Sequence, residues 1–261
     1  MLHANRARAE SFGALAELYD RARPSYPAAL VDGLLPDGAR SVLDVGCGTG
    51  IAAELFAARG CCVLGVEVDA RMAALARAKG VTVEVAPFER WEDRGRRFEL
   101  LISAQAWHWV EPTAGAARAA AVLADGGTIG AFWNLGNPPA HVRELLAPIY
   151  ARLAPELENY SVVLGSRQGR IDETAVGLAA CGAFEPAVER WFSWTQGYDA
   201  AAWVAFLRTH SDHQTLPAIQ RESLLGAVAA AVESIGGSFE MVNKTVLVSA
   251  RRRSRTATSA A

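Results

Sequence analysis

Residues 42–50, with the sequence VLDVGCGTG, constrain the fold of this chain more than any other segment. An apolar stretch typical of a buried strand leads into three closely spaced glycines, and a helix-forming stretch, residues 51–59, follows them. Glycine lets the backbone turn sharply and approach a ligand, and the N-terminus of a helix offers free N–H groups to a negative group. The pattern predicts a strand–loop–helix unit whose loop lies at the ligand-binding edge of an α/β sheet.

Strand-like and helix-like segments alternate through the first half of the chain. Short apolar runs rich in β-branched residues predict strands, and longer alanine-rich stretches predict helices. The expected strands are residues 41–45, 62–67, 81–85, 98–104 and 127–133, and the expected helices are residues 51–59, 70–79 and 114–123. This alternation predicts βαβ units, and therefore an α/β fold with a mainly parallel sheet and helices on both faces.

The second half of the chain is less regular. Residues 134–186 combine consecutive prolines, a helical stretch near 142–153 and an irregular continuation, which favours an insertion folded over one edge of the sheet. The expected later elements are strands at 187–194 and 239–250 and helices at 200–210 and 221–234. The polar, arginine-rich end, residues 251–261, is typical of a disordered tail.

The composition excludes several classes of protein. The chain of 261 residues has a formal net charge of −2, which argues against a broad nucleic-acid-binding surface, and no apolar run is long enough to span a membrane. Its N-terminus has no apolar segment of the kind that a secretion signal needs. The four cysteines contain no pair with metal-ligand spacing, so neither a zinc site nor a disulfide framework is indicated. We therefore expect a cytoplasmic protein with no nucleic-acid partner and no membrane span.

The glycine spacing distinguishes between two kinds of nucleotide cofactor. A dinucleotide-binding loop has the pattern G-x-G-x-x-G/A, which here requires Gly or Ala at position 51, and the chain has Ile51. The observed G-x-G-x-G, with Asp44 just before it, disfavours a pyrophosphate and is compatible with a nucleoside that bears an amino-acid tail. Glu67 ends the second expected strand, where a carboxylate can accept hydrogen bonds from both ribose hydroxyls, and Asp69 is the second choice. The alternative for Glu67 is an ordinary surface position.

With these features the chain resembles the class I S-adenosylmethionine-dependent methyltransferases. VLDVGCGTG is similar to the first motif of that family, and GVEVDARMAALARA, which begins at Gly65, is similar to the second. The FGALAELYDRARPSYP segment and the WHW sequence are similar to a bacterial branch that acts on small molecules, with a type 11-like domain. The resemblance implies a Rossmann-like fold with a seven-stranded, mostly parallel sheet and an antiparallel last strand. One domain would span residues 1–250, with 1–38 as an N-terminal lid and 134–186 covering the substrate.

The resemblance also implies which residues bind the cofactor, S-adenosylmethionine. The glycine loop would hold its methionine and ribose parts, Glu67 its ribose, and the carbonyl oxygen of Ala104 its ammonium group. An N-terminal segment with Tyr19 and Arg23 would close over the carboxylate. The implied cofactor-binding residues are Tyr19, Arg23, Asp44, Gly46, Cys47, Gly48, Glu67, Val68, Met72, Phe88, Glu89, Ala104 and Gln105. Proline stands at position 87, where many relatives have an aspartate that accepts from the adenine amino group.

His108 is the candidate general base. It follows the fourth expected strand, close to where the methyl group would emerge, and an imidazole suits proton removal near neutral pH. The alternative is that His108 packs against or caps the next helix. Methyl transfer is an in-line displacement, for which alignment alone supplies several kcal/mol, about 7–11 at most. A dedicated base is therefore optional.

Four ring-bearing side chains are candidates for the substrate pocket. Trp109 and Trp133 lie at strand ends, and we expect one of them to face the pocket and the other to be part of the core. His210 and His213 close a later helix, where they would form a polar wall of the pocket. Their spacing is not that of helical zinc motifs, so no metal is expected.

Three functions are compatible with these observations. The first is an enzyme that transfers a methyl group from S-adenosylmethionine to an O, N, S or C atom of a small-molecule acceptor, with S-adenosylhomocysteine as the product. The second is an NAD(P)-dependent oxidoreductase on a Rossmann-like sheet, against which Ile51 counts. The third is a non-catalytic S-adenosylmethionine-binding protein, for which the unusual Pro87 leaves room.

Overall fold

One sheet organises the described part of the chain, which in this computed structural model is residues 15–35, 40–157 and 168–254. Within these residues the sheet has seven strands in the order β3-β2-β1-β4-β5-β7-β6. The strands are β1 Ser41–Val45, β2 Cys62–Glu67, β3 Thr82–Val85, β4 Phe98–Ala104, β5 Leu123–Asn137, β6 Val188–Asp199 and β7 Ser238–Arg251. The pairs from β3 to β5 are parallel, and β7 is antiparallel to both β5 and β6. This confirms the predicted Rossmann-like α/β fold with an antiparallel last strand.

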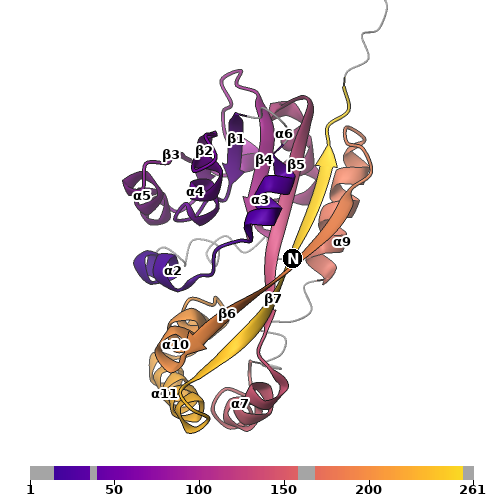
Figure 1. Cartoon of the computed structure of the whole chain (residues 1–261). Coiled ribbons are helices and arrows are strands. Elements are labelled where there is room, and N and C mark those ends of the chain that lie inside the picture. Colours follow the sequence, from indigo (N-terminus) through magenta and orange to yellow (C-terminus); the bar gives the residue numbers. More distant parts are fainter. Residues whose placement is uncertain (1–14, 36–39, 158–167, 255–261) are drawn as a thin grey trace, which may run out of the picture.

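Helices cover both faces of the sheet (Figure 1). The helices are α2 Ala16–Ala22, α3 Ala28–Leu34, α4 Ile51–Ala57, α5 Ala70–Ala78, α6 Pro112–Val122, α7 Ala140–Leu153, α9 Gln168–Cys181, α10 Ala200–Arg208 and α11 Ala218–Ser234, and the 3₁₀ turns are η3 Phe88–Arg90, η4 Trp107–Trp109 and η5 His213–Thr215. Leu30 and Phe56 belong to a buried cluster that joins α3 and α4 to one face of the sheet. Ile171 and Leu178 belong to the cluster that joins α6 and α9 to the other face.

β1 is the central strand of the parallel part, because β2 and β4 pair with its two edges. Val42 and Leu43 are fully buried and belong to the clusters on opposite faces. A parallel strand that is covered on both faces is apolar throughout, which explains why the sequence predicts the bounds of β1. The chain leaves β1 at its carboxyl end, and the glycine loop begins there.

A helical lobe extends the fold beyond the parallel strands. The long strands β5, β6 and β7 continue past β4, and α7, α10 and α11 pack against their far ends (Figure 1). Trp203 and Leu224 from the helices, with Tyr198 and Phe239 from the strands, are part of this second core. Helix α2 contacts both α10 and α5, so the N-terminal segment links the helical lobe to the helix that follows β2.

The segment 134–186, predicted as one insertion over a sheet edge, has three separate parts in the structure. Residues 134–137 complete β5, α7 joins the helical lobe, and α9 packs on α6 and β7. Residues 158–167 lie outside the described residues, as do 1–14 and 36–39 of the predicted N-terminal lid.

The first residues of the predicted tail are part of the fold. Arg251 ends β7, and the guanidinium groups of Arg252 and Arg253 donate to the carbonyl oxygens of Leu123 and Phe184, each at 2.9 Å. These contacts hold the first residues of the segment against the sheet, while residues 255–261 lie outside the described part. Among the helices that are described, none is long and apolar enough to cross a bilayer.

Candidate active site

A cavity of about 400 Å³ opens at the carboxyl ends of β1, β2 and β4, where open α/β sheets bind their ligands. The glycine loop, the loop after β3, and η4 with the start of α6 form its sides, and α2 contributes one residue. Its lining residues are Tyr19, Val45, Gly46, Gly48, Val66, Glu67, Val68, Met72, Ala86, Pro87, Phe88, Glu89, Arg90, Ala104, Gln105, Ala106, Trp109, Val110, Glu111 and Ala114.

The glycine loop adopts a backbone that only glycine tolerates well. Gly46, Gly48 and Gly50 have positive φ angles of 69°, 55° and 87°. The carbonyl oxygen of Val66 on β2 accepts hydrogen bonds from the backbone N–H groups of Gly46, at 2.8 Å, and Cys47, at 3.3 Å. These bonds hold the loop against the end of β2 and leave the peptide units of Gly46 and Gly48 on the cavity wall.

Glu67, the last residue of β2, is oriented by backbone amides. Its Oε2 accepts from the N–H of Gly48 at 2.8 Å, and its Oε1 accepts from the N–H groups of Val68, at 2.8 Å, and Asp69, at 2.9 Å. Burial raises the pKa of the Glu67 carboxyl, and the three N–H groups act in the opposite direction. A carboxylate has roughly four acceptor positions, so this one is held in place and still has room for a ligand hydroxyl.

Asp44 lies beneath the loop instead of on the cavity wall. It is fully buried, and no described group makes a hydrogen bond of normal geometry to either carboxyl oxygen. Burial, followed by the nearby charge of Glu67, raises the pKa of Asp44 to about 8, while the backbone N–H of Ala53 acts against this shift. The carboxyl therefore holds a proton at neutral pH. Cys47 is also behind the wall, packed closely against Gly65.

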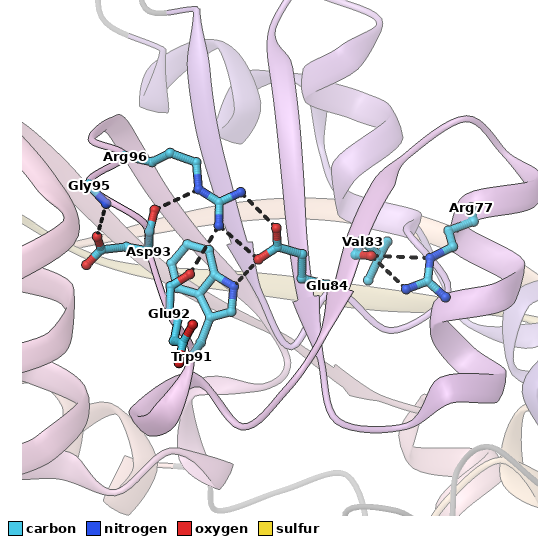
Figure 2. A network of polar contacts seen from close by, with 8 residues as sticks. All are labelled: Arg77, Val83, Glu84, Trp91, Glu92, Asp93, Gly95 and Arg96. Carbon is cyan, nitrogen blue, oxygen red and sulfur yellow. Dashed lines mark hydrogen bonds and ion pairs between the residues drawn. The ribbon is translucent and has the colours of Figure 1, made fainter.

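Glu84 of β3 anchors the segment between β3 and β4 through Trp91 and Arg96 (Figure 2). Its two carboxylate oxygens accept from the guanidinium of Arg96, each at 2.9 Å, and one of them also accepts from Nε1 of Trp91. On the other side of the strand, the guanidinium of Arg77 donates to the carbonyl oxygen of Val83 at 2.7 and 3.2 Å. This network positions η3, which forms part of the cavity wall.

Replacing Glu84 by Gln is expected to lower the free energy of unfolding by about 1–2 kcal/mol, because Arg96 then loses a charged partner. The hydrogen bond from Arg96 lowers the pKa of Glu84, so the ionised carboxylate is the form that makes the network. Urea unfolding at pH 7 measures the effect, with Glu185→Gln at an exposed position as the control. Equal losses in the two variants would contradict the anchoring role.

Gln105, directly after β4, has a φ of 57° although it carries a full side chain. Such a backbone costs about 1–3 kcal/mol and persists only where the surroundings enforce it. Here the N–H of Gln105 donates to the carbonyl oxygen of Phe132 at 2.9 Å, and its Nε2 donates to the carbonyl oxygen of Asn134 at 3.2 Å. Strain of this kind clusters at functional sites, and Gln105 lines the cavity together with Ala104.

Most residues that the family resemblance implies for the cofactor line this one cavity. They are Tyr19, Gly46, Gly48, Glu67, Val68, Met72, Phe88, Glu89, Ala104 and Gln105. Asp44 and Cys47 lie behind the wall, and Arg23 lines a smaller hollow next to the cavity. Direct contact with the cofactor stays a prediction for each residue of this set.

His108 faces away from the cavity, which corrects its expected position beside the methyl group. Successive residues of a 3₁₀ turn are about 120° apart, so in η4 Trp107 enters the core, Trp109 lines the cavity, and His108 lines a separate hollow against α9. Nδ1 of His108 accepts a hydrogen bond from Nε1 of Trp133 at 3.2 Å. An imidazole that accepts at Nδ1 carries its proton on Nε2, so the ring offers no lone pair to a substrate in the cavity. Trp133 is fully buried and belongs to the core.

His210 and His213 lie inside the helical lobe, not on the wall of the cavity, which corrects the predicted polar wall. Nδ1 of His213 lies 2.9 Å from Oδ1 of Asp212, its Nε2 lies 2.8 Å from the hydroxyl of Tyr150, and the ring of His210 packs against Phe206. His210, Asp212 and His213 bring possible metal-ligand atoms within 4.8 Å of one another. Both ring nitrogens of His213 have protein partners, so a metal ion at this place would have to displace one of them.

Sequence reasoning missed three polar residues at the site. The backbone N–H of Glu111 donates to Oε1 of Glu89 at 3.0 Å, and Glu111 lines the cavity. Asn134 of β5 and Asn243 of β7 line the smaller hollow. For Asn134 the available signal is an asparagine directly after the apolar run of β5, since a buried amide needs hydrogen-bond partners. The sequence of β7 around Asn243 mixes polar and apolar residues and gives no such signal.

Comparison with known proteins agrees with this geometry. Residues 42–127 match the family model of a methyltransferase domain. An uncharacterized methyltransferase of Mycobacterium tuberculosis (strain ATCC 25618 / H37Rv) is 38% identical over 131 residues, which are 48% of this chain and 52% of that protein. The chain therefore spans about half the length of the curated relatives that it matches.

Two solved structures share the fold over most of the chain. A candidate type II methyltransferase from Anaeromyxobacter dehalogenans has a TM-score of 0.61 and 22% identity, with 89% of this chain and 97% of that chain covered. Phosphoethanolamine N-methyltransferase 2 from Haemonchus contortus, solved with S-adenosyl-L-methionine, has a TM-score of 0.51 and 14% identity, with 95% of this chain and 59% of that chain covered. At these identities the likeness is one of fold.

Proposed function

We propose, from its membership of the class I methyltransferases, that this chain transfers a methyl group from S-adenosylmethionine to a small-molecule acceptor. The observation that carries the proposal is the loop of left-handed glycines beside Glu67, which the backbone holds at the end of β2. Glycine lets a nucleoside approach the backbone closely, and a carboxylate in this position accepts hydrogen bonds from ribose hydroxyls. The cavity beside them has the size of a cofactor site.

The charge of the cavity supports a sulfonium cofactor over a dinucleotide. Among the described residues that line the cavity, Glu67, Glu89 and Glu111 are acidic, and one, Arg90, is cationic. S-adenosylmethionine carries a sulfonium and an ammonium group against one carboxylate, so its net charge is opposite to that of this wall. The pyrophosphate of NAD would bring two further negative charges to it. Glu89 also offers a carboxylate to the adenine amino group, two residues after the proline that replaces the usual aspartate.

The reaction needs alignment more than proton transfer. When bound, S-adenosylmethionine supplies a methyl group on a positively charged sulfur. Glu67 would orient the ribose, and the carbonyl oxygen of Ala104 would receive the ammonium group. Tyr19 and Trp109 line the cavity on other sides, where their rings exclude water from the reacting atoms. Because alignment can supply a large part of the acceleration of an in-line displacement, a dedicated proton acceptor from this chain is optional.

A thermal-shift comparison of S-adenosylmethionine, S-adenosylhomocysteine, NAD and NADP tests the cofactor. A ligand at about 100 times its dissociation constant stabilises a protein by roughly 2.7 kcal/mol, which is readily detected. We expect stabilisation by the two sulfur nucleosides. Stabilisation by NAD or NADP alone would instead identify an oxidoreductase. Isotope transfer from methyl-labelled S-adenosylmethionine to a panel of small molecules then separates an enzyme from a protein that only binds the cofactor.

Replacing Glu67 by Ala is expected to weaken S-adenosylhomocysteine binding about 10- to 100-fold, the range of a lost hydrogen bond to a charged group. The variant also releases the N–H groups of Gly48, Val68 and Asp69 that hold the loop. Isothermal titration calorimetry measures the affinity, and Glu54→Ala is the control, because Glu54 lies on α4 and pairs with Lys79 away from the cavity. An affinity equal to that of the wild type would remove Glu67 from the site.

A further inference from the structure

A second, smaller hollow adjoins the cavity on the side of β5 and β7. Its volume is about 30 Å³, and Tyr19 and Gln105 line both spaces, so the two are neighbours across these side chains. Arg23, Phe206 and Asn243 are among the other residues of its wall. A space of this size accommodates a polar group of a few atoms and not a whole substrate.

Arg23 brings a positive charge to this hollow without a matching negative one. Its guanidinium lies over the rings of Tyr19, at 4.9 Å, and Phe206, at 5.4 Å, and its Nη2 donates to the carbonyl oxygen of Thr209 at 2.8 Å. Its buried Nε has no hydrogen-bond partner, and among the described residues no carboxylate forms an ion pair with it. A partly buried cation of this kind favours an anion beside it.

Asn243 brings a second unsatisfied donor to the hollow. The residue is 1% exposed, and its Nδ2 has no hydrogen-bond partner in the described part of the chain. Its neighbours are satisfied: the hydroxyl of Thr245 donates to Oδ1 of Asn134 at 2.6 Å, and Nδ2 of Asn134 donates to the carbonyl oxygen of Ser25 at 2.9 Å. Of the two asparagines in the wall of the hollow, Asn243 is therefore the one whose Nδ2 lacks a hydrogen-bond partner among the described residues.

We propose that the methyl acceptor carries a carboxylate, and that this hollow binds it between Nε of Arg23 and Nδ2 of Asn243. The two oxygens of a carboxylate satisfy the two donors, and the group neutralises Arg23. The rest of the acceptor then extends past Tyr19 and Gln105 toward the cofactor cavity. This proposal rests on the proposed methyl transfer. The carboxylate of the cofactor has the same chemistry, but Arg23 lines the hollow and not the cofactor cavity.

Cofactor titrations separate the two sources of a carboxylate. S-adenosylhomocysteine carries the amino-acid carboxylate and 5′-methylthioadenosine lacks it, so their affinities are compared in the wild type, Arg23→Gln and the control Arg21→Gln. Arg21 is exposed on the same helix and pairs with Glu17. We expect both affinities to stay within about twofold in Arg23→Gln. A loss of about tenfold or more for S-adenosylhomocysteine alone would assign Arg23 to the cofactor and overturn the proposal. A wild type that binds neither compound would overturn the proposed function itself.

Acetate then probes the hollow in protein saturated with S-adenosylhomocysteine. We expect acetate to raise the melting temperature in a saturable way, relative to equal concentrations of chloride and of the neutral analogue acetamide. Arg23→Gln and Asn243→Leu are each expected to abolish that rise, while Arg21→Gln retains it. Asn243→Leu keeps the approximate shape of the side chain, and its affinity for S-adenosylhomocysteine verifies that it is folded. No acetate effect in the wild type, or the same effect in Arg23→Gln, would overturn the proposal.

Discussion

Gly46→Ala is expected to lower the free energy of unfolding by about 3 kcal/mol and to prevent S-adenosylhomocysteine from binding. Gly46 has a φ of 69°, and a Cβ added there would lie 2.5 Å from the Cβ of Ala106. The left-handed backbone costs an alanine about 1–2 kcal/mol. Ala106 has no flexible side chain that could move aside, so the backbone itself must shift. Because both residues line the cavity, this shift also deforms the binding surface.

Gly80→Ala is the matched control, because it reproduces the backbone strain without the steric contact. Gly80 has a φ of 88°, and a Cβ added there meets nothing within 4 Å. We expect a loss of about 1 kcal/mol and an unchanged affinity for S-adenosylhomocysteine. Urea unfolding gives the stabilities and calorimetry gives the affinities. If both variants lose the same free energy of unfolding and both bind S-adenosylhomocysteine as the wild type does, the close approach of Gly46 to Ala106 contributes neither to stability nor to binding.

The parallel strands of the sheet are the elements that the sequence predicts best, because they are buried on both faces. The sequence predicts β1, β2 and β4 with the bounds that the structure has, since each is a short apolar run between two covered faces. It predicts β5 and β6 too short. β5 also includes residues 123–126 before the predicted run, and the ends of both strands over the helical lobe, residues 134–137 and 195–199, hold glycine and polar residues that are not typical of strands. The sequence does not predict helix α9, which lies within the predicted insertion 134–186.

The site residues also differ in how well the sequence predicts their positions. Residues directly after a predicted strand, such as Gly46, Glu67 and Ala104, lie at one sheet edge because parallel strands all end there. The position of His108 depended instead on a single 3₁₀ turn, in which a shift of one residue rotates the side chain by about a third of a turn. Asn243 depended on pairing between β5 and β7, which are far apart in the sequence. Local patterns do not encode either feature.

Asp44→Asn is expected to have a higher free energy of unfolding than the wild type, and the difference is expected to grow as the pH rises from about 4 to 8. The pKa of Asp44 is about 8 in the folded chain, against an ordinary value of 3.8, because burial disfavours the charged carboxylate. Between these values the unfolded chain releases the proton and the folded chain keeps it. The stability of the wild type therefore falls by about 1.4 kcal/mol per pH unit through this group, on the order of 5 kcal/mol in all.

The measured quantity is the difference in free energy of unfolding between Asp44→Asn and the wild type, taken by urea unfolding at several pH values. Asp69→Asn is the control, because Arg71 lowers the pKa of Asp69 below its ordinary value. Asp69 therefore stabilises the fold above the ordinary pKa, and that stability is lost only as the pH falls below about 4. The Asp69 difference should be flat between pH 5 and 8, where the Asp44 difference grows. A flat Asp44 difference over this range would show that the buried carboxyl is ionised in the folded protein and has a cationic or hydrogen-bonding partner.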